Sequence, residues 1–348
     1  MVSKVFYLQW NRIDSFAAWL AKIGAADHVR ENDFTAIKIH FGEAGNKGFI
    51  NPDFVKPVAS LVSGRKALPF MTDANTIYVG QRADAVRHAL VAESHGFTTK
   101  NCGCPVIIAD GLRGNSGAEV EVNLKHFKKV NIANAVNFSD SLVFMSHFKG
   151  HEISGFGGAL KNMGMGCGTR AGKYSMHDTL NPSVNESLCT GCAACVKWCS
   201  PKALKVSGKK ITLDRSKCTG CGECILSCPE RVFSIPWDEK TSNVQEKIVE
   251  YAAGALKGKR HFSINFINYV TKFCDCYATK ENPLLDDIGV MASSDPVALD
   301  QACADLVNSK FGADFWKHIF PEIDWTVQLK YAEQIGLGSR KYELEEFL

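Results

Sequence analysis

The sequence has no long run of apolar residues and no strong excess of charge of either sign. Its apolar stretches fall short of the roughly 20 residues that a transmembrane helix needs, so no membrane span is expected. The 348 residues carry a formal net charge of +3, which does not indicate a nucleic-acid partner. Low-complexity segments are absent too, and the length is sufficient for two domains.

No export signal is expected at the start of the chain. The first ten residues are too short and too mixed in polarity for a signal peptide, and we expect a first strand there. The sequence contains 14 cysteines. A disulfide framework would suit a small secreted chain, whereas this chain is long. Free thiols therefore favour a reducing cytoplasm, and an anaerobic host.

Eight of the cysteines form two runs with the same spacing, C-x2-C-x2-C-x3-C. This spacing is typical of a bacterial-type ferredoxin with two 4Fe–4S clusters, in which the fourth cysteine of each run binds the other cluster. A zinc site, often built from two separated Cys-x-x-Cys pairs, fits less well. The Cys-Thr-Gly-Cys motif recurs 29 residues on, which indicates a duplicated module. The predicted ligands of one cluster are Cys189, Cys192, Cys195 and Cys228, and those of the other are Cys218, Cys221, Cys224 and Cys199.

Outside these runs, strand-like and helix-like segments alternate. Expected strands cover 4–8, 35–41, 67–71, 105–109, 142–146, 262–269 and 287–291, and expected helices cover 13–23, 52–61, 83–93, 244–256 and 296–308. This pattern predicts an α/β fold, with a largely parallel sheet and helices on both faces. A small α+β ferredoxin module would interrupt it. The predicted parts are an α/β domain over 1–182 and 240–348, with the module inserted at 183–239.

Several expected strands end on residues that can perform chemistry. Ligands of open α/β sheets bind beyond the carboxyl ends of the strands, so these residues are candidates for one crevice. A single aspartate at a strand end is more often a turn residue or a helix cap. The candidate segments are 40–43, 73–75, 110–113 and 147–151, and the catalytic candidates among them and nearby are His40, His147, Lys149 and Lys161.

A glycine-rich stretch covers residues 155–168. It matches neither the dinucleotide fingerprint Gly-x-Gly-x-x-Gly nor a Walker loop, which requires Gly-Lys followed by Ser or Thr. Closely approaching backbone amides, with Lys161 as a point charge, would suit an anion or a cofactor. The candidate cofactor-binding residues are Gly157, Gly158, Lys161 and Asn162. A tight structural turn is the alternative reading.

The remaining six cysteines include two closely spaced pairs. In an extended segment, Cys274 and Cys276 would point to opposite sides, so a shared metal requires a turn at that point. We predict a third metal site from this pair and Cys167; buried or redox-active thiols are the alternative. The pair Cys102 and Cys104 is a weaker metal candidate. The last cysteine, at position 303, is expected in the core.

Four segments together resemble a known family. They are residues 147–151, 155–167, 274–276 and 292–300, which are similar to the domain-of-unknown-function family 362 in its form with an inserted ferredoxin. The resemblance covers nearly the whole chain and implies an iron–sulfur protein, without a substrate. The Lys-Asn and strand-end histidine pattern is also similar to the lactate racemase family, which binds a nickel-pincer cofactor; no residue role is carried over from it.

These observations favour an iron–sulfur protein that transfers electrons to or from a site in the α/β domain, as an oxidoreductase or a redox component of one. Two 4Fe–4S clusters are the expected cofactors, with an additional metal or cofactor at the crevice. A redox partner protein and a small-molecule substrate are the expected partners. The alternatives are a non-catalytic electron carrier and a metal or cofactor assembly protein. The oligomeric state is not indicated.

Overall fold

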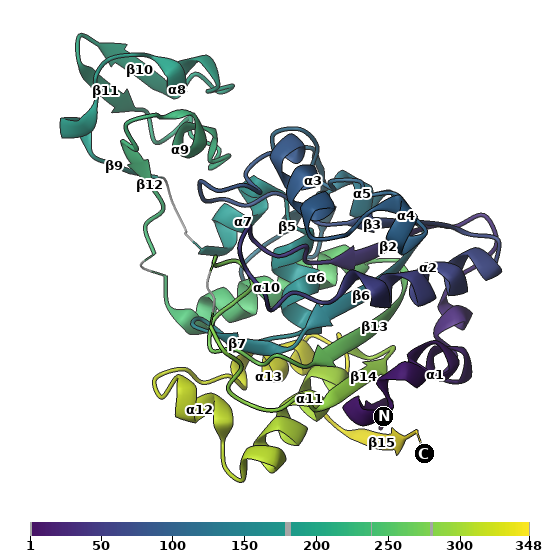
Figure 1. Ribbon diagram of the computed structural model, residues 1–348. Coiled ribbons are helices and arrows are strands. Elements are labelled where there is room, and N and C mark those ends of the chain that lie inside the picture. Colours follow the sequence, from purple (N-terminus) through teal and green to yellow (C-terminus); the bar gives the residue numbers. More distant parts are fainter. Residues whose placement is uncertain (1, 178–181, 238, 279–280, 348) are drawn as a thin grey trace.

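A seven-stranded mixed sheet forms the centre of the molecule in the computed structural model, which describes residues 2–177, 182–237, 239–278 and 281–347 (Figure 1). The strand order is β15 (Tyr342–Glu346), β1 (Ser3–Gln9), β14 (Gly289–Ser293), β13 (Arg260–Ile267), β6 (Ser141–His147), β2 (Phe34–Ile39) and β3 (Leu68–Thr72). Strands β13, β6, β2 and β3 are parallel, as are β1 and β15. Only β14 runs against its neighbours.

Alternating apolar side chains give the sheet two buried faces. In β2, Ala36 belongs to one core cluster and Ile37 to the other; in β6, Phe144 and Met145 divide in the same way. Successive strand residues point to opposite faces, so strands buried on both sides are apolar almost throughout. The sheet therefore requires a layer of helices on each face.

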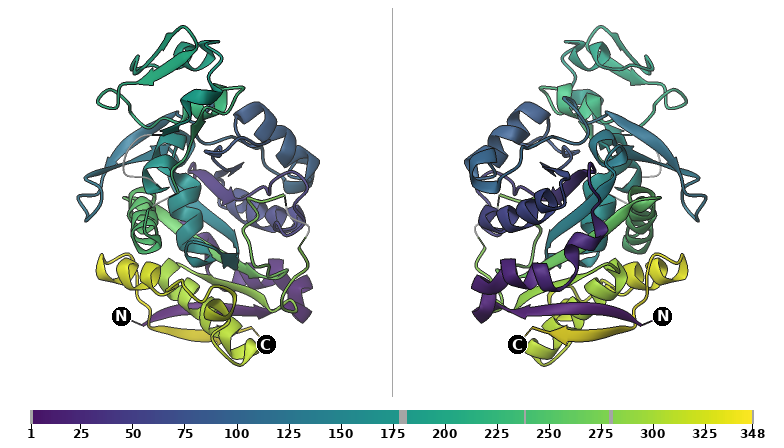
Figure 2. Two further views of the ribbon diagram at one scale, coloured as in Figure 1. Left: turned by 90° about the vertical axis from the view of Figure 1, so that its left-hand side faces the viewer. Right: turned by 90° about the vertical axis from the view of Figure 1, so that its right-hand side faces the viewer.

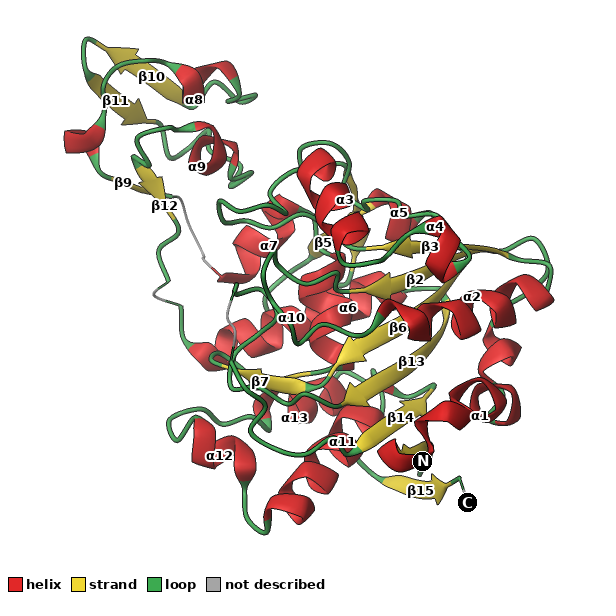
Figure 3. Ribbon diagram, in the orientation of Figure 1, coloured by secondary structure: helices red, strands yellow, loops and turns green. Residues whose placement is uncertain are grey.

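The helices supply these two layers (Figure 3). One core cluster includes residues of α5 (Asn134–Asn137), α6 (Ala159–Cys167), α7 (Arg170–His177), α10 (Thr241–Leu256), α11 (Pro296–Phe311), α12 (Phe315–Ile319) and α13 (Val327–Gln334). The other includes residues of α1 (Phe16–Lys22), α2 (Val55–Gly64), α3 (Ala85–Ser94) and α4 (Thr99–Cys102). The expected α/β class, with a mainly parallel sheet, is confirmed.

Smaller elements complete this part of the chain. They are the hairpins β4 (Gly117–Glu121) with β5 (Lys129–Ala133) and β7 (Lys149–His151) with β8 (Gly155–Gly157), and the 3-10 helices η1 (Trp10–Ser15), η2 (Ala25–His28) and η3 (Pro52–Phe54). The strand expected at 105–109 is wrong, because that segment makes only an isolated bridge from Val106 to Met71. Proline at position 105 removes one amide donor from the ladder. Cys303 is fully buried, as expected.

The cysteine-rich segment forms a small body with its own apolar core at one end of the molecule (Figure 2). It contains β9 (Ser183–Val184) paired with β12 (Phe233–Ser234), β10 (Leu204–Ser207) paired with β11 (Lys210–Leu213), η4 (Glu186–Leu188), α8 (Ala194–Lys197) and α9 (Glu223–Ser227). We call it the cysteine module. The boundaries 182/183 and 239/240 stay predictions, and residues 178–181 and 238 beside them lie outside the described ranges.

None of the helices in the described part of the chain is both long and apolar enough to cross a membrane.

Candidate functional site

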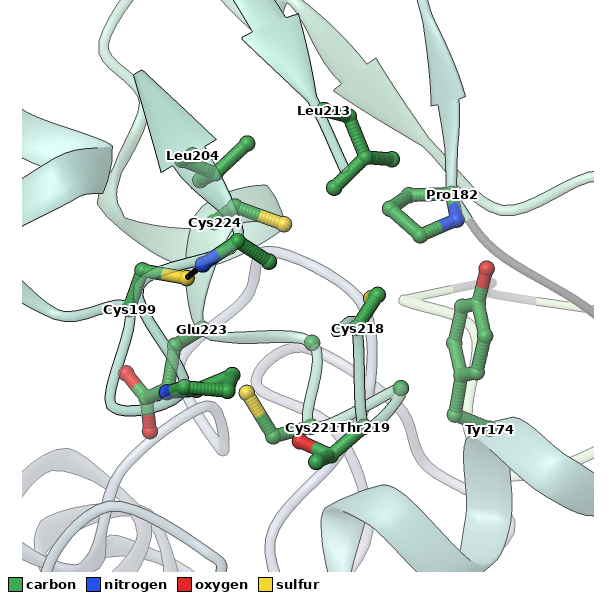
Figure 4. Close-up of a pocket in the computed structure, with 14 residues that line it drawn as sticks. Tyr174, Pro182, Cys199, Leu204, Leu213, Cys218, Thr219, Cys221, Glu223 and Cys224 are labelled. Atoms are coloured by element: carbon green, nitrogen blue, oxygen red, sulfur yellow. Dashed lines mark hydrogen bonds between the residues drawn. The ribbon is translucent and has the colours of Figure 1, made fainter. Parts of the chain in front are cut away.

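The cysteine module contains two hollows, each lined by four cysteines. One is lined by Cys199, Cys218, Cys221 and Cys224, with Tyr174 of α7 at its rim (Figure 4). The other is lined by Cys189, Cys192, Cys195 and Cys228. Each set joins three cysteines of one run to the fourth of the other. Each hollow thus brings together the four cysteines of one predicted ligand set, and cluster binding by these sets stays a prediction.

Local backbone geometry turns the cysteines of each run toward one point. Ala193 and Gly222, which precede the short helices α8 and α9, both have left-handed backbone conformations, with φ of 57° and 70°. The amides of Ala203 and Val232 point at the sulfurs of Cys199 and Cys228, at 3.2 Å and 3.4 Å. Backbone donors around the sulfurs suit thiolates that carry cluster charge, so these residues fit the expected group.

The carboxylate of Glu223, next to Cys224, forms one contact between the module and the α/β domain. Arg113 donates to its Oε2 at 2.8 Å, and Arg170 donates to its Oε1 at 3.1 Å. Arg170 is fully buried and also donates to the carbonyl oxygens of Thr76, Ala83 and Arg113. Its guanidinium therefore joins the module to the loop that follows β3.

This loop, residues 73–84, lies between the module and the strand ends. Ile77 belongs to the apolar core of the module, and Tyr78 packs against that core. The hydroxyl of Tyr78 donates to the carbonyl oxygen of Cys276 at 3.1 Å, and it accepts from Arg82 at 2.7 Å. One short segment thus contacts both the module and the sulfur-bearing turn at the crevice.

A buried charge cluster lies where β2 and β3 end. Lys38 pairs with Asp73 at 2.9 Å, and Arg82 pairs with Asp73 at 3.4 Å and with Glu43 at 3.2 Å. Burial raises the pKa of Asp73, but the charge of Lys38 and the hydrogen bond from His88, with the other nearby groups, together hold it well below its usual range. Close opposite charges are what keeps such a carboxylate ionised in a buried position.

A second buried group connects β6 to the segment after β13. Nδ1 of His147 lies 2.9 Å from the carboxylate of Asp275, and Nε2 lies 2.8 Å from the carbonyl oxygen of Asn268. Both ring nitrogens thus face acceptor oxygens. Lys149 approaches the same carboxylate at 3.4 Å. The two candidates His147 and Lys149 therefore position Asp275 and, through it, the turn that carries Cys274 and Cys276.

Residues 274–277 form a turn, closed by a hydrogen bond of 3.1 Å from the Tyr277 amide to the Cys274 carbonyl oxygen. The turn brings the sulfurs of Cys274 and Cys276 to 3.0 Å from each other. Lys161 donates to Cys274 at 3.5 Å, and Nε2 of His40 lies 3.5 Å from Cys276. Although burial opposes its charged form, the neighbouring sulfurs raise the pKa of Lys161.

The site is open to solvent only in part. His40, Lys161, Asn162 and Cys276 are partly exposed, whereas Cys274 is buried. The side-chain amide of Asn162 already has hydrogen-bond partners for both its oxygen and its nitrogen. It accepts from Lys38 at 2.8 Å, and it donates to Ser146 at 3.0 Å and to the carbonyl oxygens of Met145 and Lys38. A ligand that enters would therefore meet His40, Lys161 and the Cys276 sulfur.

The glycine-rich stretch consists mainly of β8 and α6, and its glycines allow close packing. A side chain at Gly164 would lie 2.0 Å from the carbonyl oxygen of Ile248 in α10, and one at Gly158 would lie 2.3 Å from the carboxylate of Asp300. The first amides of α6 donate to Asp300, at 2.7 Å and 2.9 Å. These amides are therefore not available to an anion, and cofactor binding by Gly157 and Gly158 stays a prediction.

Asp300 is expected to make the free energy of unfolding of the protein depend on pH. Burial raises the pKa of Asp300 to about 6, above the value of roughly 3.9 in an unfolded chain. Between these values the folded state binds more protons, so this group's contribution to stability falls as pH rises. We expect the free energy of unfolding of the native protein to fall by about 1 kcal/mol between pH 5 and pH 7, beyond any change over the same range in the variant Asp300→Asn. Urea titrations at both pH values test this; an unchanged difference would contradict it.

The predicted third metal site is only partly assembled. Cys274 and Cys276 lie together, but the sulfur of Cys167 contacts the carbonyl oxygen of Asn162, at 3.8 Å, inside α6. Among the residues that the structure describes, no group of three or more His, Cys, Asp or Glu side chains is placed to hold one metal ion. The third site stays a prediction. The strand-end segment 110–113 is connected to the other site residues only through Asn75, whose side-chain amide donates to the carboxylate of Asp110 at 2.8 Å.

Sequence reasoning missed several members of the site, namely Lys38, Tyr78, Arg82, Arg170 and Glu223. Lys38 carried a usable signal, since it interrupts an otherwise apolar strand. The others are in loops and short helices whose partners are distant in the sequence, and no local pattern identifies them.

The family described as "Domain of unknown function (DUF362)" matches residues 35–305. This chain belongs to the DUF362 family. The match includes both strand-end clusters, the cysteine module and the turn at 274–277. Membership in the DUF362 family and the many cysteines are compatible with an iron–sulfur protein.

Two solved structures are similar to this chain. The lactate racemase apoprotein from Thermoanaerobacterium thermosaccharolyticum is 11% identical, with a TM-score of 0.41, over 82% of this chain and 50% of that one. A crystal structure of a protein from Thermotoga maritima is 9% identical, with a TM-score of 0.36, over 93% of this chain and 59% of that one. The chain thus spans between half and three fifths of their lengths. No curated protein matches the sequence.

Proposed function

We propose that this DUF362 chain is an iron–sulfur protein that carries electrons between a partner protein and the crevice at the strand ends. When bound, 4Fe–4S clusters supply or accept single electrons. The two sets of four cysteines would hold them. The observation that carries the proposal is the position of Tyr78, which packs against the module core and donates to the carbonyl oxygen of Cys276. A contact from the module to the sulfur-bearing turn is what such a transfer requires.

The two hollows differ in their surroundings, and this difference indicates which cluster would exchange electrons with the partner protein and which with the crevice. The one lined by Cys218, Cys221 and Cys224 borders Tyr174 of the α/β domain. The other has no α/β residue among its lining residues, and its Cys192 is exposed. A redox partner would dock at the outer hollow, and the inner one would serve the crevice. The lysines of the module suit an acidic partner surface.

At the crevice, the residues present are suited to proton and anion handling. Nδ1 of His40 accepts from the Gly42 amide at 3.0 Å, so the neutral ring carries its proton on Nε2, facing Cys276. Burial, with the charge of Arg82, holds the pKa of His40 well below its usual range. Lys161 would fix an anionic substrate or a thiolate. We place this reductive chemistry in the cytoplasm, where free thiols and clusters persist.

Iron analysis of anaerobically purified protein tests the proposal. We expect about eight irons per chain, and after reduction an EPR spectrum of two interacting S = 1/2 centres. Cys221→Ser should lower the iron content to about four, because it removes one ligand from the inner set. Cys303→Ser, a buried cysteine outside both sets, is the control and should keep about eight. Protein without iron, or with zinc in its place, would contradict the proposal.

A carrier without its own substrate is the second candidate function, and the exposure of Cys192 is compatible with it. A carrier would need no reactive groups at the crevice. Replacement of Lys161 by methionine distinguishes the two: a carrier should reduce its partner at an unchanged rate, whereas an oxidoreductase should lose turnover of its substrate.

A further inference from the structure

The turn at residues 274–277 holds the sulfurs of Cys274 and Cys276 close to each other, at 3.0 Å. We propose that Cys274 and Cys276 form a reversible dithiol–disulfide pair that takes up two electrons at the end of the path from the cysteine module. This inference rests on the proposed function for the origin of the electrons. The pair itself is argued from its own geometry and surroundings.

The backbone of the turn is held by hydrogen bonds at each of its residues. The Tyr277 amide donates to the carbonyl oxygen of Cys274, the Glu43 amide donates to that of Asp275 at 3.0 Å, and Tyr78 donates to that of Cys276. The Asp275 side chain is held on the other side by His147. The sulfurs, 3.0 Å apart, need only a small approach to reach the disulfide bond length of about 2.05 Å.

The charges around the pair favour a thiolate at one position and a thiol at the other. Lys161 donates to Cys274, while the neutral ring of His40 donates to Cys276. Lys149 is a second cation near the pair, since its ammonium lies 3.4 Å from the carboxylate of Asp275, the residue between the two cysteines. Thiolates next to cations are the reactive form in thiol–disulfide exchange.

The same chain offers a matched pair without these features. Cys102 and Cys104 have the same spacing and are fully buried, but the Cys102 sulfur faces the carbonyl oxygens of Pro52 and Gly96. Burial raises the pKa of Cys102 to about 11 and that of Cys104 to about 12. Spacing is therefore not sufficient; the turn and the adjacent lysine distinguish the pair at 274–276.

The step balances with the groups at the site. In the reductive direction, the S–S bond breaks, two electrons enter one at a time, and one proton reaches Cys276, which leaves a Cys274 thiolate beside Lys161. That proton comes from solvent, to which Cys276 is partly exposed, and the Nε2–H of His40 donates a hydrogen bond to the Cys276 sulfur. In the oxidative direction, an azo oxidant such as diamide takes the two electrons, the proton of Cys276 and one proton from water and becomes a hydrazine, while the S–S bond forms.

The test uses the full chain with its iron, purified anaerobically. The protein is oxidised with diamide, freed of reagent, alkylated with iodoacetamide and digested. We expect the peptide with Cys274 and Cys276 to escape alkylation and to be lighter by two hydrogens than the dithiol peptide. The diamide-treated protein is then titrated with photoreduced deazaflavin. We expect it to accept about two electrons more than Cys274→Ser/Cys276→Ser, because a disulfide takes two.

The double variant Cys102→Ser/Cys104→Ser is the control and should accept as many electrons as the unmodified protein. Full alkylation of Cys274 and Cys276 after diamide would overturn the inference, as would equal electron uptake with and without the pair. Bound metal that is lost in Cys274→Ser/Cys276→Ser would also overturn it. Iron content and EPR of the same sample report on the proposed function separately, since the peptide result does not depend on them.

Discussion

Replacement of Arg170 by methionine is expected to lower the free energy of unfolding by about 3–5 kcal/mol. Arg170 is 1% exposed, and its guanidinium pairs with Glu223 and donates to three backbone carbonyl oxygens. Methionine fills much of the volume but donates no hydrogen bond. The carbonyl oxygens of Thr76, Ala83 and Arg113 would lose these donors in a buried position, and the carboxylate would lose its buried cation. Urea titration of the anaerobic protein measures the loss.

Arg113→Met is the matched control, because Arg113 binds the same carboxylate at 2.8 Å but has a side chain that is 41% exposed. Arg113 also stacks on the ring of Trp198 at 3.7 Å, but its partly exposed guanidinium leaves no buried carbonyl oxygen without a donor when it is removed, so its loss should be smaller than that of Arg170. Equal losses in the two variants would show that Arg170 does not join the module to the loop after β3. If only Arg170→Met loses stability, this variant should also take up electrons more slowly at the pair Cys274 and Cys276.

The second large effect is expected at Asp275. Asp275→Asn should lower the free energy of unfolding by about 3–5 kcal/mol, because it leaves the buried ammonium of Lys149 and the buried ring of His147 without their carboxylate partner. The variant should also form less of the disulfide at 274–276, since the turn loses the anchor on its other side. Urea titration and peptide mapping after diamide measure the two effects on one preparation.

Asp286→Asn is the control for this substitution. Asp286 is exposed and lies in the same connecting segment, so the change should be within about 0.5 kcal/mol. Unchanged stability of Asp275→Asn, with undiminished disulfide formation, would contradict the role given to Asp275. A stability loss without any change in disulfide formation would show that the turn is held by its backbone hydrogen bonds alone.

Local patterns in the sequence predict a large part of this architecture. Buried parallel strands such as β2 and β6 are apolar almost throughout, and Asp295 followed by Pro296 marks the start of α11, where Asp295 accepts from the amides of Val297 and Ala298. The segment at 105–109 has the same composition but lies beyond the sheet edge. Pairing at an edge depends on neighbours, which a local pattern does not contain.

The site is a different case. His40, His147, Lys149 and Lys161 were predictable as candidates, because they follow strand ends or lie in an unusual glycine-rich stretch. Their roles were not: His147 and Lys149 hold Asp275, and Lys161 approaches a sulfur. Likewise, the glycines suggested a ligand cradle, whereas Gly164 permits the close approach of α6 to α10. Each role depends on a partner more than 80 residues away.

The sequence by itself determined the α/β class, the two four-cysteine runs and membership in the family, because all of these are encoded in spacing and periodicity along the chain. Only the tertiary structure decided that Glu223 of the module pairs with arginines of the α/β domain, and that a turn brings Cys274 and Cys276 together. These features result from packing between distant segments. Arg170 and the turn at 274–277 obtain their partners only when those distant segments have packed together.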